Sequence, residues 1–121
     1  MISDVSDRDF DRVVGRSQVP VLVEFWKPGC GGCRALTRQL ERLVGEVGGS
    51  LLVLKMNVEE NFQIPSELEI TSLPALALYR GGQFERFIGG LVGVGRVAAA
   101  RSVRAAPRSA RCRKSTGQPA A

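Results

Sequence analysis

The sequence predicts an α/β domain in which helices cover both faces of a mixed central sheet. Residues 19–26 and 51–58 are apolar runs rich in Val and Leu, which is typical of strands buried on both faces. A helical pattern over residues 30–47 separates them, and such a unit implies a right-handed crossover between parallel strands. Residues 75–80 and 83–88 flank a Gly-Gly pair and predict an antiparallel hairpin. A sheet with both kinds of pairing is therefore expected.

The remaining elements complete the predicted order. Residues 2–5 are expected to form a short first strand. Ser6 is expected to cap a first helix that ends at Gly15, because Ser is a favoured N-cap residue and Gly a favoured terminator. Residues 65–68 can form a short helix with Pro65 in its first turn.

Charge is distributed unevenly along the 121 residues, whose net charge is +5. Residues 1–90 are slightly acidic, whereas residues 91–121 carry seven basic side chains and no acidic one. We therefore expect a domain over 1–90, a poorly defined segment with helix-forming alanines over 91–106, and a disordered basic tail over 107–121. The tail lacks interleaved aromatic residues, so no nucleic-acid partner is expected.

The N-terminal residues, Met1–Asp4, have neither the basic nor the apolar region of a signal peptide. No apolar run is long enough to cross a bilayer, so no membrane partner is expected. Three cysteines fit a reducing compartment with a catalytic dithiol. These observations predict a cytoplasmic protein.

Reactive chemistry is concentrated in the stretch Gly29-Cys30-Gly31-Gly32-Cys33, where a buried strand passes into a helix. A thiolate is the nucleophile in disulfide exchange, and the N-terminus of a helix stabilises it. The spacing lets the second sulfur reach the first, so that one cysteine attacks and the other resolves.

Half of a zinc site has the same C-x-x-C spacing, but such a site needs two further ligands. The chain contains no His, and Cys112 is the only other cysteine. Redox chemistry is therefore favoured over metal binding. Cys112 is interpreted as a free thiol of the tail, and the alternative is a regulatory or intermolecular disulfide.

Five separated features, which agree in order, resemble the thioredoxin family over roughly residues 5–90. They are Phe25-Trp26 before the dithiol, Cys30-Gly31-x-Cys33, Lys55-x-Asn57-Val58-Glu59, Ser72-Leu73-Pro74-Ala75, and Tyr79-Arg80-Gly81-Gly82 with Gly89 after it. The resemblance implies a thioredoxin fold and dithiol–disulfide exchange with protein substrates.

The same resemblance implies the substrate-binding residues. Pro74 would be preceded by a cis peptide bond and would face the dithiol, and the backbone of Leu73 would pair with the substrate chain. Gly29, Gly31 and Gly32 would border the bound substrate.

The chain also departs from the family pattern. Gly29 stands in place of a Trp, Gly32 in place of a Pro, and Arg38 in place of a helix-kinking Pro. Glu24 stands where the family has a buried Asp. The family's last amphipathic helix has no convincing match after Gly90, which makes the C-terminal segment atypical.

Glu24 is a carboxyl group within a strand that is predicted to be buried. One interpretation is a proton acceptor for Cys33, because burial raises the pKa of a carboxyl toward neutrality. The other is an ion pair with Lys55 that only satisfies burial. The resemblance favours the first, with Lys55 in a supporting role. Trp26 is interpreted as core packing at the end of the strand.

The dithiol and the resemblance together predict a protein-disulfide reductase. Cys30 would form a mixed disulfide with the substrate, and Cys33, assisted by Glu24, would resolve it. We expect no bound cofactor or metal, and a monomer. The expected partners are disulfide-containing proteins and a thioredoxin-reductase-like electron donor. The alternative is a thioredoxin-fold binding or holdase module whose dithiol is incidental.

The proposed division of the chain can be tested by truncation. Removing residues 107–121 should leave the melting temperature almost unchanged, because this stretch has no large apolar side chain to bury. Removing residues 91–121 should lower the melting temperature clearly without unfolding the protein. A fall of many degrees on loss of residues 107–121 alone would contradict a disordered tail.

Overall fold

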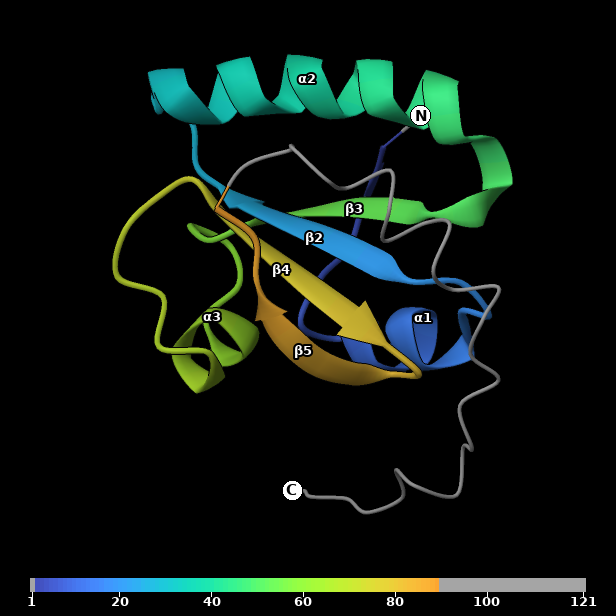
Figure 1. Cartoon of the computed structure of the whole chain (residues 1–121). Coiled ribbons are helices and arrows are strands. Elements are labelled where there is room, and N and C mark those ends of the chain that lie inside the picture. The colour runs from blue at the N-terminus through green and yellow to red at the C-terminus, as the bar shows by residue number, and fades with distance from the viewer. Residues whose placement is uncertain (1, 90–121) are drawn as a thin grey trace.

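The computed structural model describes residues 2–89, which form a five-stranded mixed sheet between two layers of helices (Figure 1). The expectations for residues 91–106 and 107–121, and for Cys112, lie outside the described residues. The order of elements along the chain is the predicted one, with helices alternating with strands until a terminal hairpin. The predicted mixed α/β architecture is confirmed.

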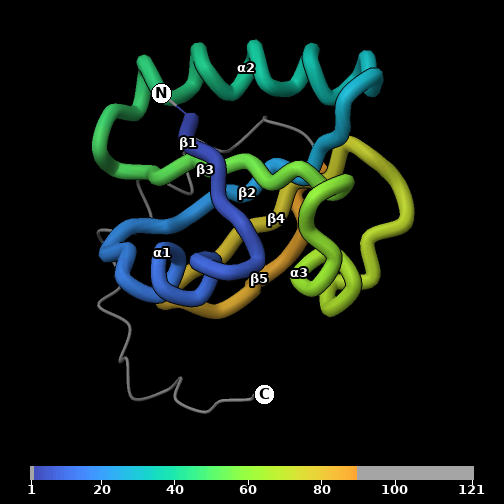
Figure 2. Tube along the Cα trace, turned by 180° about the vertical axis from the view of Figure 1, so that it is seen from behind, coloured from blue at the N-terminus to red at the C-terminus, as the bar shows by residue number. Residues whose placement is uncertain are grey.

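The sheet has the strand order β1-β3-β2-β4-β5. Its strands are β1 (Ser3–Asp4), β2 (Val21–Trp26), β3 (Leu52–Asn57), β4 (Ala75–Arg80) and β5 (Gln83–Phe87). β3 pairs in parallel with both β1 and β2, whereas β2 pairs antiparallel with β4, and β4 with β5. The tube view from behind shows β1 beside β3 (Figure 2). The crossover between parallel strands and the hairpin are therefore both confirmed.

β2 lies at the centre of the sheet because its sequence is apolar on both faces. Every residue from Val21 to Phe25 is buried, and Glu24 is the one charged residue among them. Pro20 precedes the strand, where no ladder N–H is lost. Burial of each large apolar side chain contributes roughly 1.5–3 kcal/mol, so this strand anchors both cores.

Helices cover the two faces of the sheet unequally. Among the described residues, α2 (Gly31–Val47) is the one helix on one face, and α1 (Phe10–Arg16) and α3 (Gln63–Glu67) lie on the other (Figure 1). The core beneath α2 is built from Ile2, Leu22, Leu40, Leu43, Leu51, Val53, Leu76 and Leu78. The core on the α1 and α3 side includes Phe10, Val14, Val21, Val23, Phe25, Leu54, Met56, Ile64, Ala77 and Tyr79.

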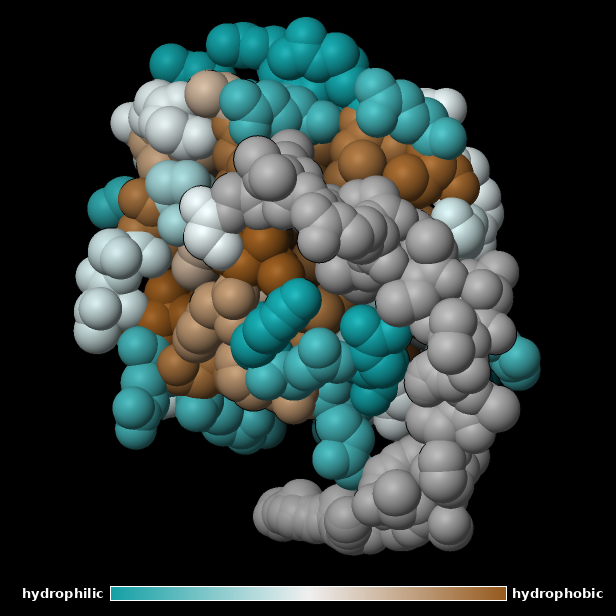
Figure 3. Space-filling view, in the orientation of Figure 1, coloured by the Kyte–Doolittle hydropathy of each residue, from teal (hydrophilic) through white to brown (hydrophobic). Residues whose placement is uncertain are grey.

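α2 is amphipathic, and its apolar stripe sets its orientation over the sheet. Leu40 and Leu43 are buried, and Leu36, Val44 and Val47 pack against the same core. The outer surface of the helix is hydrophilic (Figure 3). Arg38 lies within a helix that is continuous over its 17 residues, as expected where a backbone N–H replaces the imino group of a proline.

The N-terminal capping differs from the prediction. α1 begins at Phe10 with Asp9 as its N-cap, and Ser6 instead donates from its backbone N–H and its hydroxyl to Asp9 Oδ1, at 2.8 and 3.0 Å. These bonds lower the pKa of Asp9. α1 ends at Arg16, one residue beyond Gly15, and α3 begins at Gln63, two residues before Pro65. Local capping preferences were therefore wrong about these helix ends.

Asp7 connects the N-terminal segment to α3. Its carboxylate accepts hydrogen bonds from the backbone N–H groups of Gln63 (2.8 Å) and Ile64 (2.9 Å), which are free donors at the start of that helix. Its own N–H donates to Asn61 Oδ1 at 2.7 Å. Asp7 therefore acts as an N-cap from a distant part of the chain.

The hairpin between β4 and β5 closes on Gly81 and Gly82, whose φ angles are +62° and +81°. Two positive φ values characterise a type I′ turn, which favours glycine at both positions. A bulge at Leu78 and Tyr79 shifts the register, so that Phe84 lies opposite Tyr79 and Phe87 opposite Ala77. The two Phe rings consequently lie side by side, with centroids 5.1 Å apart.

Replacing Asp7 should destabilise the fold through the loss of this distant cap. We expect Asp7→Ala to cost about 1 kcal/mol of unfolding free energy, which corresponds to a fall of roughly 4–8 °C in Tm for a domain of this size. Glu46→Ala, which removes a charge from the exposed surface of α2, is the control and should change Tm little. Equal losses in the two variants, measured by thermal melts, would contradict the capping role.

Candidate active site

The two dithiol cysteines lie where β2 passes into α2 and are joined by a disulfide. Cys30 is the N-cap of α2 and is half-buried, whereas Cys33, in the first turn, is only 2% exposed. The backbone N–H of Cys33 donates to Cys30 Sγ at 3.1 Å. The first sulfur is therefore the one nearer to solvent, and it accepts a hydrogen bond from a free N–H at the helix start.

A tight turn presents Cys30. Pro28 and Gly29 occupy its two central positions, Gly29 has a φ of +86°, and the N–H of Cys30 donates to the carbonyl of Lys27 at 3.3 Å. Pro at the second position and a positive φ at the third are the signature of a type II turn. Glycine suits this position because a side chain would be strained at such a φ.

Pro74 lies beside the dithiol, and the Leu73–Pro74 peptide bond is cis, as expected. A Cβ atom on Gly32 would lie 3.3 Å from Pro74 Cδ, so the Gly32 backbone approaches the proline ring closely. Gly29, Gly31, Gly32 and Pro74 are exposed, and Leu73 is half-buried. The predicted substrate-binding residues around Cys30 thus form a rim of three exposed glycines and the exposed proline ring, with the Leu73 side chain half-buried beside them.

Glu24 is fully buried beneath α2, in the middle of β2. Its carboxyl oxygens lie 2.8 and 3.0 Å from the hydroxyl of Thr37, which is also 2.9 Å from the carbonyl oxygen of Cys33. Burial raises the pKa of Glu24, and the Thr37 hydrogen bond and the Lys55 charge reduce this rise. A buried carboxyl is thus connected through one hydroxyl to the turn that carries Cys33.

Lys55 does not form the ion pair that one interpretation of Glu24 required. The two residues are in register on neighbouring strands, but among residues 2–89 no ion pair within 4.0 Å includes Glu24. The Lys55 ammonium instead lies 5.5 Å from the centroid of the half-buried Trp26 ring, which is a cation–π geometry. Lys55 therefore acts on Glu24 as a nearby positive charge without direct contact.

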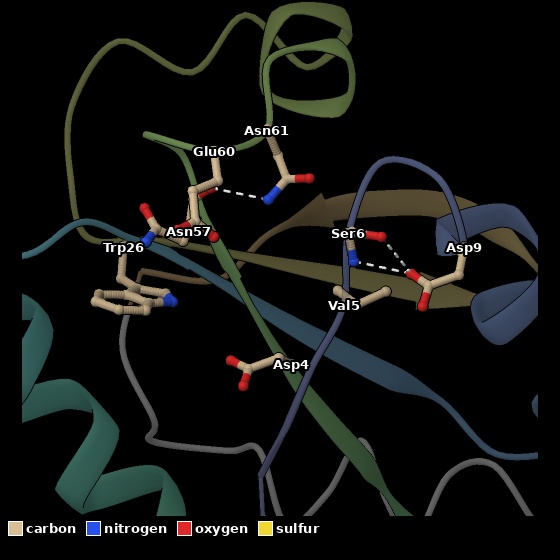
Figure 4. Close-up of a pocket in the computed structure, with 8 residues that line it drawn as sticks. All are labelled: Asp4, Val5, Ser6, Asp9, Trp26, Asn57, Glu60 and Asn61. Carbon is tan, nitrogen blue, oxygen red and sulfur yellow. Dashed lines mark hydrogen bonds between the residues drawn. The ribbon is translucent and has the colours of Figure 1, made fainter.

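Trp26 also borders a pocket of about 400 Å³ between the N-terminal segment and the end of β3 (Figure 4). The pocket is lined by Asp4, Val5, Ser6, Asp9, Trp26, Asn57, Glu60 and Asn61. The indole nitrogen of Trp26 points into it and has no hydrogen-bond partner among the described residues. Trp26 is thus only partly the core residue that was expected.

Within residues 2–89, no group of three His, Cys, Asp or Glu side chains is arranged to hold a metal ion. In the same part of the chain, no helix combines the length and apolar character needed to cross a membrane.

The structure places the predicted residues in two connected groups. Gly32 and Pro74 lie beside the Cys30–Cys33 disulfide, and the buried Glu24 is connected to Cys33 through Thr37. Sequence reasoning missed Thr37, which joins the groups. The sequence feature that could have identified Thr37 is a hydroxyl residue one helical turn after Cys33, a position from which Ser and Thr side chains hydrogen-bond to the carbonyl of the preceding turn.

A half-exposed cysteine at a helix N-terminus, linked to a buried cysteine and flanked by a cis-proline, defines a thiol–disulfide oxidoreductase site. Comparison with known proteins agrees. The family model described as Thioredoxin matches residues 1–99, and the chain belongs to the thioredoxin family. Members of this family are protein-disulfide oxidoreductases, and the chain is therefore an enzyme of this class.

Several curated relatives are similar over most of their length. The thioredoxin of Rickettsia felis is 42% identical over 83 residues, which cover 69% of this chain and 79% of that protein. The thioredoxin of Haemophilus influenzae is 38% identical over 79 residues, covering 65% and 74%. Thioredoxin 1 of a Nostoc species is 40% identical over 81 residues, covering 67% and 76%.

A solved structure shares the fold. Chloroplastic thioredoxin z superposes with a TM-score of 0.71 at 20% identity, covering 85% of this chain and 96% of that chain. This likeness confirms the thioredoxin fold that the sequence predicted.

The raised pKa of Glu24 predicts a pH-dependent stability. In the unfolded chain this carboxyl returns to its ordinary value near 4.5, so between that value and the folded pKa the folded state holds the proton more tightly. Its stabilising contribution is therefore complete at acidic pH and is lost as the pH rises through the folded pKa. Glu24→Gln does not titrate, and its Tm should rise relative to the parent as the pH increases.

Thermal melts across a pH series measure this difference. Glu46→Gln, on the exposed surface of α2, is the matched control and should stay close to the parent throughout. A difference between Glu24→Gln and the parent that is constant with pH would show that Glu24 does not titrate abnormally.

Proposed function

We propose that this enzyme reduces disulfide bonds in proteins through Cys30 and Cys33, with a mixed disulfide as intermediate. The observation that carries the proposal is the asymmetry of the pair. Cys30 is half-buried at the N-terminus of α2, and Cys33 is almost completely buried behind it. Only the first sulfur can be reached by a large substrate, and only the second is placed to release it.

The reaction has two exchange steps. The Cys30 thiolate attacks one sulfur of the substrate disulfide, forms the mixed disulfide and expels the other sulfur as a thiolate, which takes up a proton. The Cys33 thiolate then attacks Cys30 Sγ, breaks the mixed disulfide and releases the second substrate sulfur. The substrate gains two electrons and two protons, and the protein is left with the Cys30–Cys33 disulfide.

Glu24 accepts the proton of Cys33 before the second step. A buried carboxylate with a raised pKa is a stronger base than an exposed one. Thr37 contacts both this carboxyl and the carbonyl of Cys33, so the base lies beneath the turn that carries the second thiol. Lys55 adds a positive charge that limits the rise in pKa, and its contact with Trp26 holds that charge in place.

The rim around Cys30 binds the substrate chain. Gly29, Gly31 and Gly32 leave the approach to Cys30 free of side chains, and Pro74 provides an apolar contact beside them. The backbone of Leu73 pairs with an extended segment of the substrate. A disulfide in an exposed, extended segment is the substrate that fits such a rim.

A thioredoxin-reductase-like enzyme returns electrons to the Cys30–Cys33 disulfide. The dithiol carries the electrons itself, so the proposed reaction needs no bound cofactor, and we expect the enzyme to act as a monomer. The cytoplasm is the compartment in which such a dithiol would be kept reduced.

The activity is tested with insulin as a model substrate and a small dithiol as reductant, in a Cys112→Ser background that removes the tail thiol. The parent should accelerate insulin reduction, and Cys30→Ser and Cys33→Ser should both lose this acceleration. Cys33→Ser should accumulate a covalent adduct through Cys30, because the resolving thiol is missing, whereas Cys30→Ser should not.

The adducts are measured by mass spectrometry under non-reducing conditions. Equal trapping by both variants would refute the assigned roles of the two cysteines. Binding of insulin without accelerated reduction would instead support the alternative, a binding or holdase module with an incidental dithiol.

A further inference from the structure

The hydroxyl of Thr37 lies within hydrogen-bond distance of three acceptor atoms. They are Glu24 Oε1 at 2.8 Å, Glu24 Oε2 at 3.0 Å and the carbonyl oxygen of Cys33 at 2.9 Å. A threonine hydroxyl has only one proton to donate, although it can accept from others. The three contacts cannot all be hydrogen bonds donated by Thr37 at the same time.

The protonation state of Glu24 decides which contact is made. When Glu24 is ionised, its oxygens can only accept, and the hydroxyl donates to the charged carboxylate, which is the strongest acceptor available. When Glu24 is protonated, its own O–H can donate to Thr37 Oγ1, and the threonine proton is free to bond the Cys33 carbonyl. Both arrangements fit the observed distances without moving a heavy atom.

Few other groups near Glu24 could form a hydrogen bond that depends on its protonation state. From β3, the charge that acts on Glu24 is that of Lys55, whose ammonium lies over Trp26. From α2, Thr37 supplies the hydroxyl, which also lies 2.9 Å from the carbonyl oxygen of Cys33. On β4, Glu24 is paired with the apolar Leu76. Among the described residues, Thr37 makes the side-chain hydrogen bonds of this fully buried carboxyl.

We propose that Thr37 is a positioning residue whose hydroxyl changes its hydrogen-bond acceptor with the protonation state of Glu24. It donates to the carboxylate when Glu24 is ionised and to the Cys33 carbonyl when Glu24 is protonated. The hydroxyl thereby stabilises the base form of Glu24 and keeps its carboxyl against the turn that carries Cys33. This inference deepens the proposed function, because it assumes that Glu24 takes the proton of Cys33.

The consequence is a defined effect on titration. A hydrogen bond to a charged group is stronger than one to a neutral group, so removing the hydroxyl costs the ionised form of Glu24 more than the protonated form. The pKa of Glu24 should therefore rise when the hydroxyl is lost. A merely structural bond from Thr37 back to the helix would leave the titration of Glu24 unchanged.

The test compares Thr37→Val, which keeps the shape but lacks the hydroxyl, with Thr37→Ser, which keeps the hydroxyl. Both are made in the full chain with Cys112→Ser. Carbon NMR of the Glu24 carboxyl in the oxidised protein measures its titration directly. Thr37→Val should move the midpoint to higher pH, and Thr37→Ser should leave it near that of the parent. An unchanged midpoint in Thr37→Val would overturn the inference.

A kinetic measurement tests the link to the second exchange step. The reduced protein is mixed with a dithiobis-nitrobenzoate reagent, from which Cys30 releases the first coloured thiol and Cys33 the second. At pH values below the midpoint, Thr37→Val should slow the second release roughly fivefold, which is the factor separating charged from neutral hydrogen bonds. At alkaline pH, where Glu24 is ionised in every variant, the rates should converge.

The two measurements separate the inference from the proposed function. A shifted NMR midpoint with no change in the second release would support the placement of Thr37 and refute Glu24 as the base. A rate that falls equally at all pH values, or that Thr37→Ser fails to restore, would show that the hydroxyl has only a structural role and would overturn the inference.

Discussion

The turn from Lys27 to Cys30 joins β2 and α2, the most deeply buried strand and the longest helix within residues 2–89, and the placement of the reactive sulfur depends on it. β2 is held on both sides by β3 and β4, and α2 is held by its apolar stripe over the sheet. The chain must change direction between two rigid elements within four residues. Pro28 and the positive φ of Gly29 make this possible and place Cys30 at the first free N–H groups of the helix.

A second constraint is the carboxyl group buried in β2. Burying a carboxyl is unfavourable unless it is neutral or well hydrogen-bonded, and within residues 2–89 Glu24 has a single hydroxyl, Thr37, within hydrogen-bond distance. Its pKa is therefore raised, although Lys55 is near. The fold thus keeps, under its reactive turn, a carboxyl group whose raised pKa is lowered by a hydrogen bond to one helical side chain, and this group is the base that we propose. Stability and reactivity are linked through the same group.

Regular patterns made most of the fold predictable from the sequence. The unbroken Val and Leu run of β2, the helical spacing of Leu36, Leu40 and Leu43, and the Gly-Gly turn each depend on near neighbours in the chain. Capping by Asp7 was missed because its partner Ile64 is 57 positions away. The cysteine pair was identified by its spacing.

The contacts of the candidate site were less predictable, because they depend on side-chain directions. Lys55 was considered as an ion-pair partner of Glu24, yet its long side chain reaches the ring of Trp26 instead. Thr37 was not identified, because its partner lies 13 positions earlier on another element. The bulge in the hairpin has a further consequence, at the β5 edge of the described sheet. β5 is the outermost strand and carries two exposed aromatic rings, Phe84 and Phe87, a combination that favours edge-to-edge aggregation. The bulge bends the strand and interrupts the regular spacing of its backbone N–H and C=O groups. Another β-strand therefore pairs poorly with this edge. If the enzyme binds extended substrate chains as we propose, the bulge disfavours pairing of those chains with β5.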